Sequence, residues 1–253
     1  MSRRNRILHS TVALAAAAAV LSSCSEDDAD ASSPAVAASS TQVAAGSSIP
    51  STSEVALPAG VLPLPSPDAN DDIAIDQAGR YRIALSDTLA LDIDLPQTAV
   101  LFGDGLYVKL DDSFLKLETA GETYGVPDDP CHGPHYLTAP RAGVDPLVRA
   151  IANQRPYSAT QPRTVEVGGA DGRYLELRLP PSYDASKCVD AQLGLPGNSG
   201  TNNNMAPGYV GDWWIVDVDG QRTVLQAFCE KCDDPTTNRM TRMVRSVTFT
   251  PTS

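Results

Sequence analysis

The chain has 253 residues, of which 42% are hydrophobic and 20% are charged, and its net charge is −12 at pH 7. So strongly acidic a chain disfavours binding to nucleic acid and to anionic lipid headgroups, because both carry negative phosphates. We therefore expect a folded protein that has no nucleic-acid partner.

The first 23 residues have the pattern of a secretory signal peptide. Arg3, Arg4 and Arg6 form a positive region ahead of the apolar run 12–21. That run is shorter than the roughly 20 residues needed to span a bilayer, so it favours a signal over a membrane anchor. Loss of residues 1–23 removes three of the 19 basic residues and none of the 31 acidic ones, which leaves 16 against 31 and a net charge of −15.

The end of this segment, Leu21-Ser22-Ser23-Cys24, resembles the lipobox of bacterial lipoproteins. The resemblance implies that Cys24 becomes the mature N-terminus and carries covalent lipid, with acyl chains such as palmitate anchoring the protein in the bilayer. No other cofactor is expected. The location implied is the outer, extracytoplasmic face of the cell membrane. The alternative is a soluble secreted protein cut after an ordinary small residue.

The next segment, 25–57, is rich in Ser and Ala, and no aromatic residue occurs before Tyr81. Such a segment buries too little apolar surface to offset the entropy lost on ordering. The sequence therefore predicts a signal peptide at 1–23, a disordered tether at 24–65 and a single globular domain at 66–253.

Alternation of apolar and polar residues predicts several β-strands in the globular part. In segment 89–95 the apolar residues share one face, so Asp92 and Asp94 are expected to face outward. Segments 163–167 and 173–179 are expected to form a hairpin across Gly-Gly-Ala-Asp-Gly.

A further hairpin is predicted between segments 213–218 and 221–228, which only Asp219-Gly220 separates. An Asp-Gly pair between two strands is a strong hairpin signal, because a type I′ turn needs positive φ at both positions. These hairpins predict an antiparallel sheet.

Helical spacing of apolar residues occurs at 144–151 and at 240–247. Asp145 and Pro146 are interpreted as the cap and first-turn proline of the first helix, and another Asp-Pro pair precedes the second. The chain then ends in a short strand. The predicted fold class is α+β, with an antiparallel sheet of several hairpins packed by two helices and preceded by a disordered tether.

The stretches VEVGGADGRYLELRLP and WWIVDVDGQRTVLQAF, with a helix ending in MVRSVTF, resemble a family of uncharacterised actinobacterial lipoproteins and extracytoplasmic domains. The resemblance covers roughly residues 80–250 and extends to a Mog1/PsbP-like architecture. Its motifs are structural, so it implies no catalytic residues. It does imply cysteines at the positions of Cys131 and Cys188.

Four cysteines remain beside Cys24, and in an oxidising compartment they allow three disulfide connectivities. The family resemblance implies Cys131–Cys188, which leaves Cys229–Cys232 as a local addition. The alternative for the second pair is a redox-active Cys-x-x-Cys motif. Two aspartates directly after Cys232 disfavour the thiolate that such chemistry needs.

One cysteine and two histidines lie close together at Cys131, His132 and His135. These residue types bind zinc, and Cys229 and Cys232 have the spacing of structural zinc ligands. The alternative is a polar loop stiffened by its prolines and glycine, with the cysteine in a disulfide. Both interpretations remain open from the sequence.

Trp213, Trp214 and Tyr209 form a candidate binding surface. Adjacent strand residues face opposite sides of a sheet, so one Trp enters the core and the other could stack on a ligand beside Tyr209. The alternative is that a second layer buries both tryptophans.

The sequence as a whole predicts a membrane-anchored envelope lipoprotein whose domain binds a small ligand or a protein partner. Its rivals are a metal-binding lipoprotein and an extracytoplasmic enzyme. The enzyme would be either a hydrolase using His132 and His135 or a thiol oxidoreductase using Cys229 and Cys232.

Overall fold

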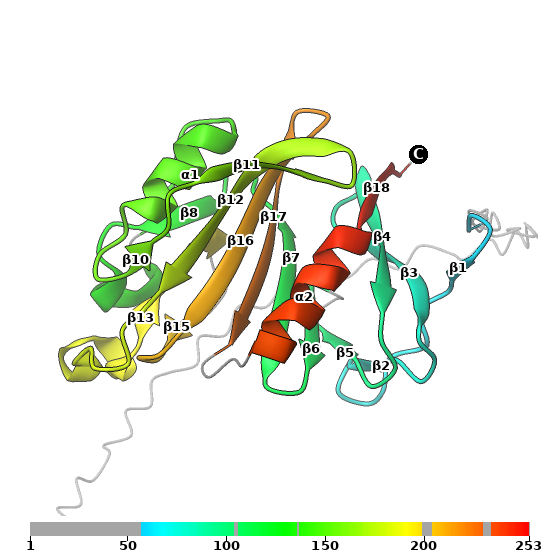
Figure 1. Ribbon diagram of the computed structural model, residues 1–253, viewed down its shortest axis with the longest axis horizontal. Coiled ribbons are helices and arrows are strands. Elements are labelled where there is room, and N and C mark those ends of the chain that lie inside the picture. Colours follow the sequence, from blue (N-terminus) through cyan, green and yellow to red (C-terminus); the bar gives the residue numbers. More distant parts are fainter. Residues whose placement is uncertain (1–56, 104–105, 136, 199–203, 230–233, 253) are drawn as a thin grey trace, which may run out of the picture. The chain divides into compact units, whose positions relative to one another are not determined.

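The computed structural model describes residues 57–103, 106–135, 137–198, 204–229 and 234–252. They belong to one compact unit, Glu54–Ser253, in which mostly antiparallel strands and two α-helices confirm the predicted α+β fold (Figure 1). The predicted signal peptide, Cys24 and most of the predicted tether lie outside the described residues. No helix in the described ranges is long and apolar enough to cross a membrane.

The largest sheet contains nine strands: β2 (Ile73–Ala74), β5 (Val100–Phe102), β6 (Tyr107–Leu110), β7 (Ser113–Thr119), β10 (Ser158–Ala159), β11 (Arg163–Val167), β12 (Ala170–Arg178), β16 (Val210–Val218) and β17 (Gln221–Cys229). Their order is β10-β12-β16-β17-β7-β6-β5-β2, and β11 also pairs with β12. All these pairings are antiparallel, so the sheet is built from hairpins as predicted.

A second sheet has the order β1-β3-β4-β18 and contains β1 (Val61–Leu62), β3 (Gly79–Ala84), β4 (Leu89–Leu95) and β18 (Thr248–Pro251). Two small sheets complete the fold: β14-β8-β9, with β8 (Tyr124–Pro127), β9 (Leu137–Thr138) and β14 (Gly197–Asn198), and β13-β15, with β13 (Leu193–Gly194) and β15 (Asn204–Met205). Three short 3-10 segments lie at Pro130–His135, Ala185–Lys187 and Val189–Ala191.

Both predicted hairpin turns are present. Asp219 and Gly220 have φ values of 51° and 83° between β16 and β17, as a type I′ turn requires. Gly168 and Gly169, with φ values of 58° and 83°, form the turn between β11 and β12. Strand β12 therefore starts at Ala170, earlier than the sequence indicated.

The two helices, α1 (Val144–Ala152) and α2 (Asp234–Ser246), pack on opposite faces of the large sheet (Figure 1). Each face carries its own hydrophobic cluster. Met243 of α2 joins the cluster that contains Trp214, whereas Leu147 of α1 joins the one that contains Trp213. Because neighbouring strand residues point to opposite faces, adjacent tryptophans serve different cores.

Three local predictions need correction. The residue that caps α1 is Gly143, with φ of 93° and no side-chain cap, and Asp145 lies one residue inside the helix. The predicted tether extends too far, because Val61–Leu62 form β1 and pair in parallel with β3. Asp92 is only 6% exposed, since the guanidinium of Arg82 binds both its carboxylate oxygens.

Candidate functional site

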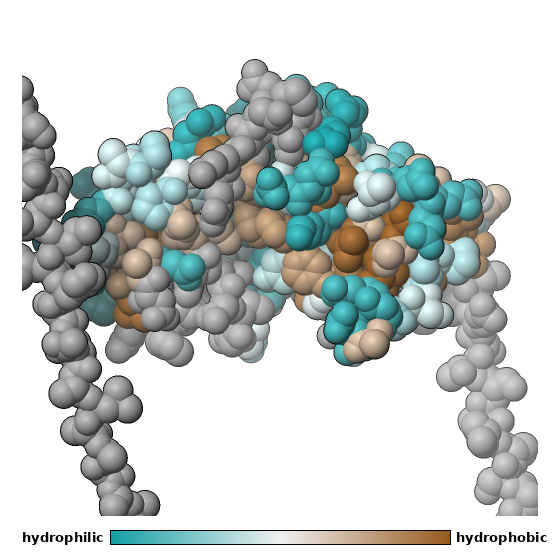
Figure 2. Space-filling view, turned by 90° about the horizontal axis from the view of Figure 1, so that it is seen from below, coloured by the Kyte–Doolittle hydropathy of each residue, from teal (hydrophilic) through white to brown (hydrophobic). Residues whose placement is uncertain are grey.

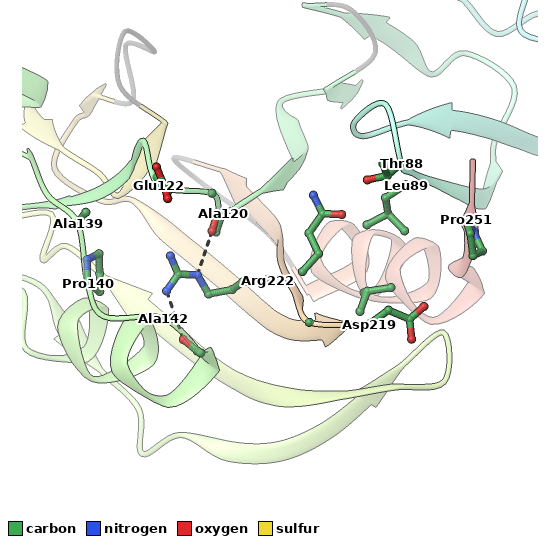
Figure 3. Close-up of a pocket in the computed structure, with 15 residues that line it drawn as sticks. Thr88, Leu89, Ala120, Glu122, Ala139, Pro140, Ala142, Asp219, Arg222 and Pro251 are labelled. Atoms are coloured by element: carbon green, nitrogen blue, oxygen red, sulfur yellow. Dashed lines mark hydrogen bonds between the residues drawn. The ribbon is translucent and has the colours of Figure 1, made fainter. Parts of the chain in front are cut away.

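A cleft of about 640 Å³ opens beside the β16–β17 turn. Its walls come from four parts of the chain: residues 120–122 after β7, residues 139, 140, 142 and 143 before α1, the hairpin residues 218–222, and Thr88 and Leu89 with Pro251 (Figure 3). A volume of this size is in the range of small-molecule sites.

Arg222 is the only basic residue lining this cleft, counted over the residues that the structure describes. Its Nε donates a hydrogen bond to the carbonyl oxygen of Ala120 at 3.2 Å. Its Nη1 donates to the carbonyl oxygens of Arg141 at 3.0 Å and Gly143 at 3.3 Å. The guanidinium therefore reaches from β17 to the segment that leads into α1, and its position is set by three backbone groups, of which Figure 3 draws those of Ala120 and Gly143.

Arg222 differs from the other half-buried arginines of the described part because it forms no ion pair with an aspartate. Across the described ranges, four more arginines are half-buried, and each is paired with an aspartate: Arg80, Arg82, Arg173 and Arg239. Arg222 has no carboxylate within ion-pair distance among these residues, and burial lowers the pKa of its guanidinium. The carbonyl oxygens that bind this half-buried cation are neutral, so they provide no negative charge to offset the cost of burying it.

The remaining lining combines apolar walls with an acidic rim. Leu89 and Pro251 lie on the side of the cleft opposite Pro140 and Arg222 (Figure 3). Glu122 and Asp219 also line the cleft, and both are exposed. The site can thus hold an apolar group between its walls and offer one positive charge at one end.

A smaller hollow of about 490 Å³ lies between β3, β4 and α2, and its lining includes Arg80, Arg239 and Arg242. Asp94 pairs with Arg80 at 3.1 Å and Asp111 pairs with Arg239 at 2.7 Å. Because aspartates already balance two of its three cations, we consider this hollow the weaker candidate.

The face of the domain that points down in Figure 1 is mixed in character. Figure 2 shows hydrophobic residues grouped there beside hydrophilic ones. A chain with a net charge of −12 is therefore not uniformly polar on this face.

Three of the four cysteines predicted to form disulfides, Cys131, Cys188 and Cys229, are disulfide-bonded. Cys131 is bonded to Cys188, with a Cα–Cα distance of 4.5 Å, which confirms that pairing. Cys229 is also disulfide-bonded. Cys232, its predicted partner, lies outside the described residues, so the Cys229–Cys232 pairing stays a prediction.

The predicted histidine site is only partly described. His132 is exposed, and its Nδ1 lies 2.8 Å from a carboxylate oxygen of Asp129. His135 lies in the 3-10 segment Pro130–His135, but its side chain is outside the described part. With Cys131 in a disulfide, the thiolate that a zinc site would use is absent. The side chains that the structure describes include no group of three or more potential metal ligands.

The predicted aromatic binding surface is corrected by the structure. Trp213 and Tyr209 are 0% exposed and Trp214 is 7% exposed, because helices or loops cover both faces of the sheet. The hydroxyl of Tyr209 accepts a hydrogen bond from Gln226 at 3.0 Å. These three residues build the core, and none of them offers a ring for stacking on a ligand.

Sequence reasoning missed both Arg222 and a buried ion pair on β7. Lys116 Nζ lies 2.8 Å from Glu118 Oε1, and each side chain is at most 3% exposed. Glu118 also accepts a hydrogen bond from Asn198 at 3.0 Å. The signal available in the sequence was the pattern Phe-Leu-Lys-Leu-Glu, which places two opposite charges on one face of a strand.

Comparison with models of known protein families gives no match, and a search of curated proteins gives no match either. The assignment of a function therefore depends on the residues and geometry of this chain.

Proposed function

We propose that this protein is a lipid-anchored, extracytoplasmic binding module whose α+β domain holds a small ligand in the cleft beside Arg222. The observation that carries the proposal is the half-buried guanidinium in a cleft of ligand size, with no carboxylate of the described residues within ion-pair distance of it. A ligand that reaches this guanidinium would supply the interaction that no carboxylate of the described residues provides.

The location in the envelope is supported by two independent features. The segment ending at Cys24 combines a positive region, an apolar run and a lipobox-like sequence. The Cys131–Cys188 disulfide is of the kind that persists outside the reducing cytosol. The resemblance to actinobacterial lipoproteins supports the same location, and with it the bilayer as the partner of an acylated Cys24.

The anchoring part of the proposal is tested by Cys24→Ala in the full chain. We expect the wild-type protein in the membrane fraction and the variant in the soluble fraction, because the variant has no thiol to be acylated. A Cys24→Ala protein that stays in the membrane fraction after washing at high salt would contradict acylation at this residue.

The binding part is tested with residues 24–253 carrying Cys24→Ser, a soluble form that keeps the whole unit Glu54–Ser253. Small neutral, anionic and cationic aromatic fragments are titrated while backbone amide shifts are recorded. We expect saturable shifts at the cleft glycines Gly121, Gly143 and Gly220. Gly79, in the other hollow, serves as the control. Shifts confined to Gly79 would move the binding site to that hollow, and an absence of any saturable shift would remove the proposed function.

A further inference from the structure

The hydrogen-bonding capacity of Arg222 is only partly used. Its Nε and Nη1 donate to the carbonyl oxygens of Ala120, Arg141 and Gly143. A guanidinium has five N–H groups, and the two on Nη2 have no hydrogen-bond partner among the described residues. Nη2 is also not one of the completely buried polar atoms that lack a partner, and it belongs to a side chain that lines the cleft.

The positive charge of the Arg222 guanidinium determines which kind of ligand binds it best. A hydrogen bond between a cation and an anion is about twice as strong as a neutral one, and partial burial increases the difference. The three carbonyl oxygens provide hydrogen bonds but no negative charge. A ligand carboxylate would provide both at Nη2.

The rim of the cleft limits how much negative charge the ligand can carry. Glu122 and Asp219 are exposed lining residues, and neither forms an ion pair with a basic side chain of the described part. A second carboxylate on the ligand would therefore meet like charge, which reduces affinity. The walls at Leu89 and Pro251 instead favour an apolar body.

We infer that the ligand class of this cleft is a small monocarboxylate with an apolar body. Its carboxylate accepts a hydrogen bond from Arg222 Nη2, and its apolar part packs between Leu89, Pro140 and Pro251. This inference rests on the proposed function, since it names the ligand chemistry of the same cleft.

The test compares three probes that share one 3-phenylpropanoyl skeleton. They are titrated into the soluble form described above, at low ionic strength. They are 3-phenylpropionate, its neutral amide 3-phenylpropanamide, and benzylmalonate, which adds a second carboxylate. From the shifts of Gly121, Gly143 and Gly220, we expect 3-phenylpropionate to bind at least about tenfold more tightly than either of the others.

Substitutions show which charged side chains cause the differences in affinity between the probes. Arg222→Gln should remove the preference of 3-phenylpropionate over its amide, whereas Arg141→Gln, which removes an exposed positive charge nearby, should keep it. The double variant Glu122→Gln and Asp219→Asn should bring the affinity for benzylmalonate up to that for 3-phenylpropionate. The probe comparison on the unchanged cleft does not depend on whether Arg222→Gln folds.

The outcomes separate this inference from the proposed function. If the acid and the amide shift the cleft glycines with equal affinity, the cleft remains a binding site and the carboxylate inference is overturned. If benzylmalonate binds as tightly as 3-phenylpropionate, the restriction to one negative charge is overturned. If no probe shifts these glycines, both the inference and the proposed function fail.

Discussion

Lys116 and Glu118 lie two residues apart on β7 and point to the same face of the large sheet. Burial lowers the pKa of Lys116 and raises the pKa of Glu118, because both charged forms are desolvated, while their mutual attraction acts in the opposite direction. Asn198 and the ring of Tyr107, whose centroid is 5.6 Å from Lys116 Nζ, add further contacts. Each charge therefore depends on the other for its place in the core.

Removal of one partner should cost much more than removal of both. We expect Lys116→Met to lower the free energy of unfolding by about 3–5 kcal/mol, because Glu118 would keep an uncompensated buried charge. The double variant Lys116→Met and Glu118→Met should recover most of that loss. Urea denaturation at neutral pH measures both values.

An exposed pair provides the matched control. Glu176 and Arg178 are also two residues apart on a strand, but their side chains are 22% and 56% exposed. Arg178→Met should cost no more than about 1 kcal/mol. If the double variant on β7 is no more stable than Lys116→Met, the loss comes from packing and the electrostatic explanation fails.

The loss caused by Lys116→Met should also depend on pH. Burial raises the pKa of Glu118 above its ordinary value of 4.5, and loss of the lysine raises it further. Since the folded variant then binds this proton more tightly than the unfolded chain, its stability rises as the pH falls through the folded pKa. The difference from wild type should shrink between pH 8 and pH 5, as followed by urea denaturation at each pH. A difference that stays constant over that interval would exclude Glu118 as its origin.

The hairpin β16–β17 is the element that positions Arg222. Its turn, Asp219-Gly220, keeps both residues at positive φ, and Arg222 is the second residue of β17. The register pairs Val218 with Gln221 and Asp217 with Arg222, so the turn geometry sets where the guanidinium leaves the sheet.

A side chain at the second turn position should destabilise this hairpin. We expect Gly220→Ala to cost about 1–2 kcal/mol, because φ of +83° is unfavourable for L-residues. Gly121→Ala is the control, since a methyl group there meets no atom within 4 Å and the backbone does not require glycine. Thermal unfolding compares the two, and equal effects would mean that the positive φ is not the cause.

For the whole domain, the Cys131–Cys188 disulfide joins parts of the chain that lie 57 residues apart. Cys131 follows β8 in the 3-10 segment Pro130–His135, and Cys188 lies after β12 between two further 3-10 segments. The bond closes the part of the chain that contains α1; Cys188 belongs to the hydrophobic cluster around that helix, and Cys131 packs against it. It therefore restrains the irregular side of the domain.

Removal of this disulfide should lower the stability of the whole unit. In the chain-entropy model, a closed loop of this length contributes about 4 kcal/mol, so Cys131→Ala with Cys188→Ala should lower the free energy of unfolding by about that amount. Urea denaturation under non-reducing conditions measures this difference. Added reductant should lower the free energy of unfolding of the wild-type protein by a similar amount. A double variant as stable as wild type would show that packing alone holds this region.

The features that can be predicted from the sequence are those set by interactions between residues close together in the chain. The hairpin turn at Asp219-Gly220 and the helices α1 and α2 were recognisable, because φ preferences and helical spacing act over a few residues. The cap of α1 was misplaced, because Gly143 begins the helix through its backbone conformation without a side-chain hydrogen bond.

The sequence by itself determined the α+β class, the positions of both helices and of β4, β11, β12, β16 and β17, and the acidic charge, since these follow from local periodicity and composition. Only the tertiary structure decided that Trp214 is buried and that no carboxylate of the described residues lies within ion-pair distance of Arg222. Alternation along a strand shows which residues share a face, but not what covers that face. The Arg222 cleft is formed by segments from 88 to 251, and residues so far apart in sequence meet only when the chain packs.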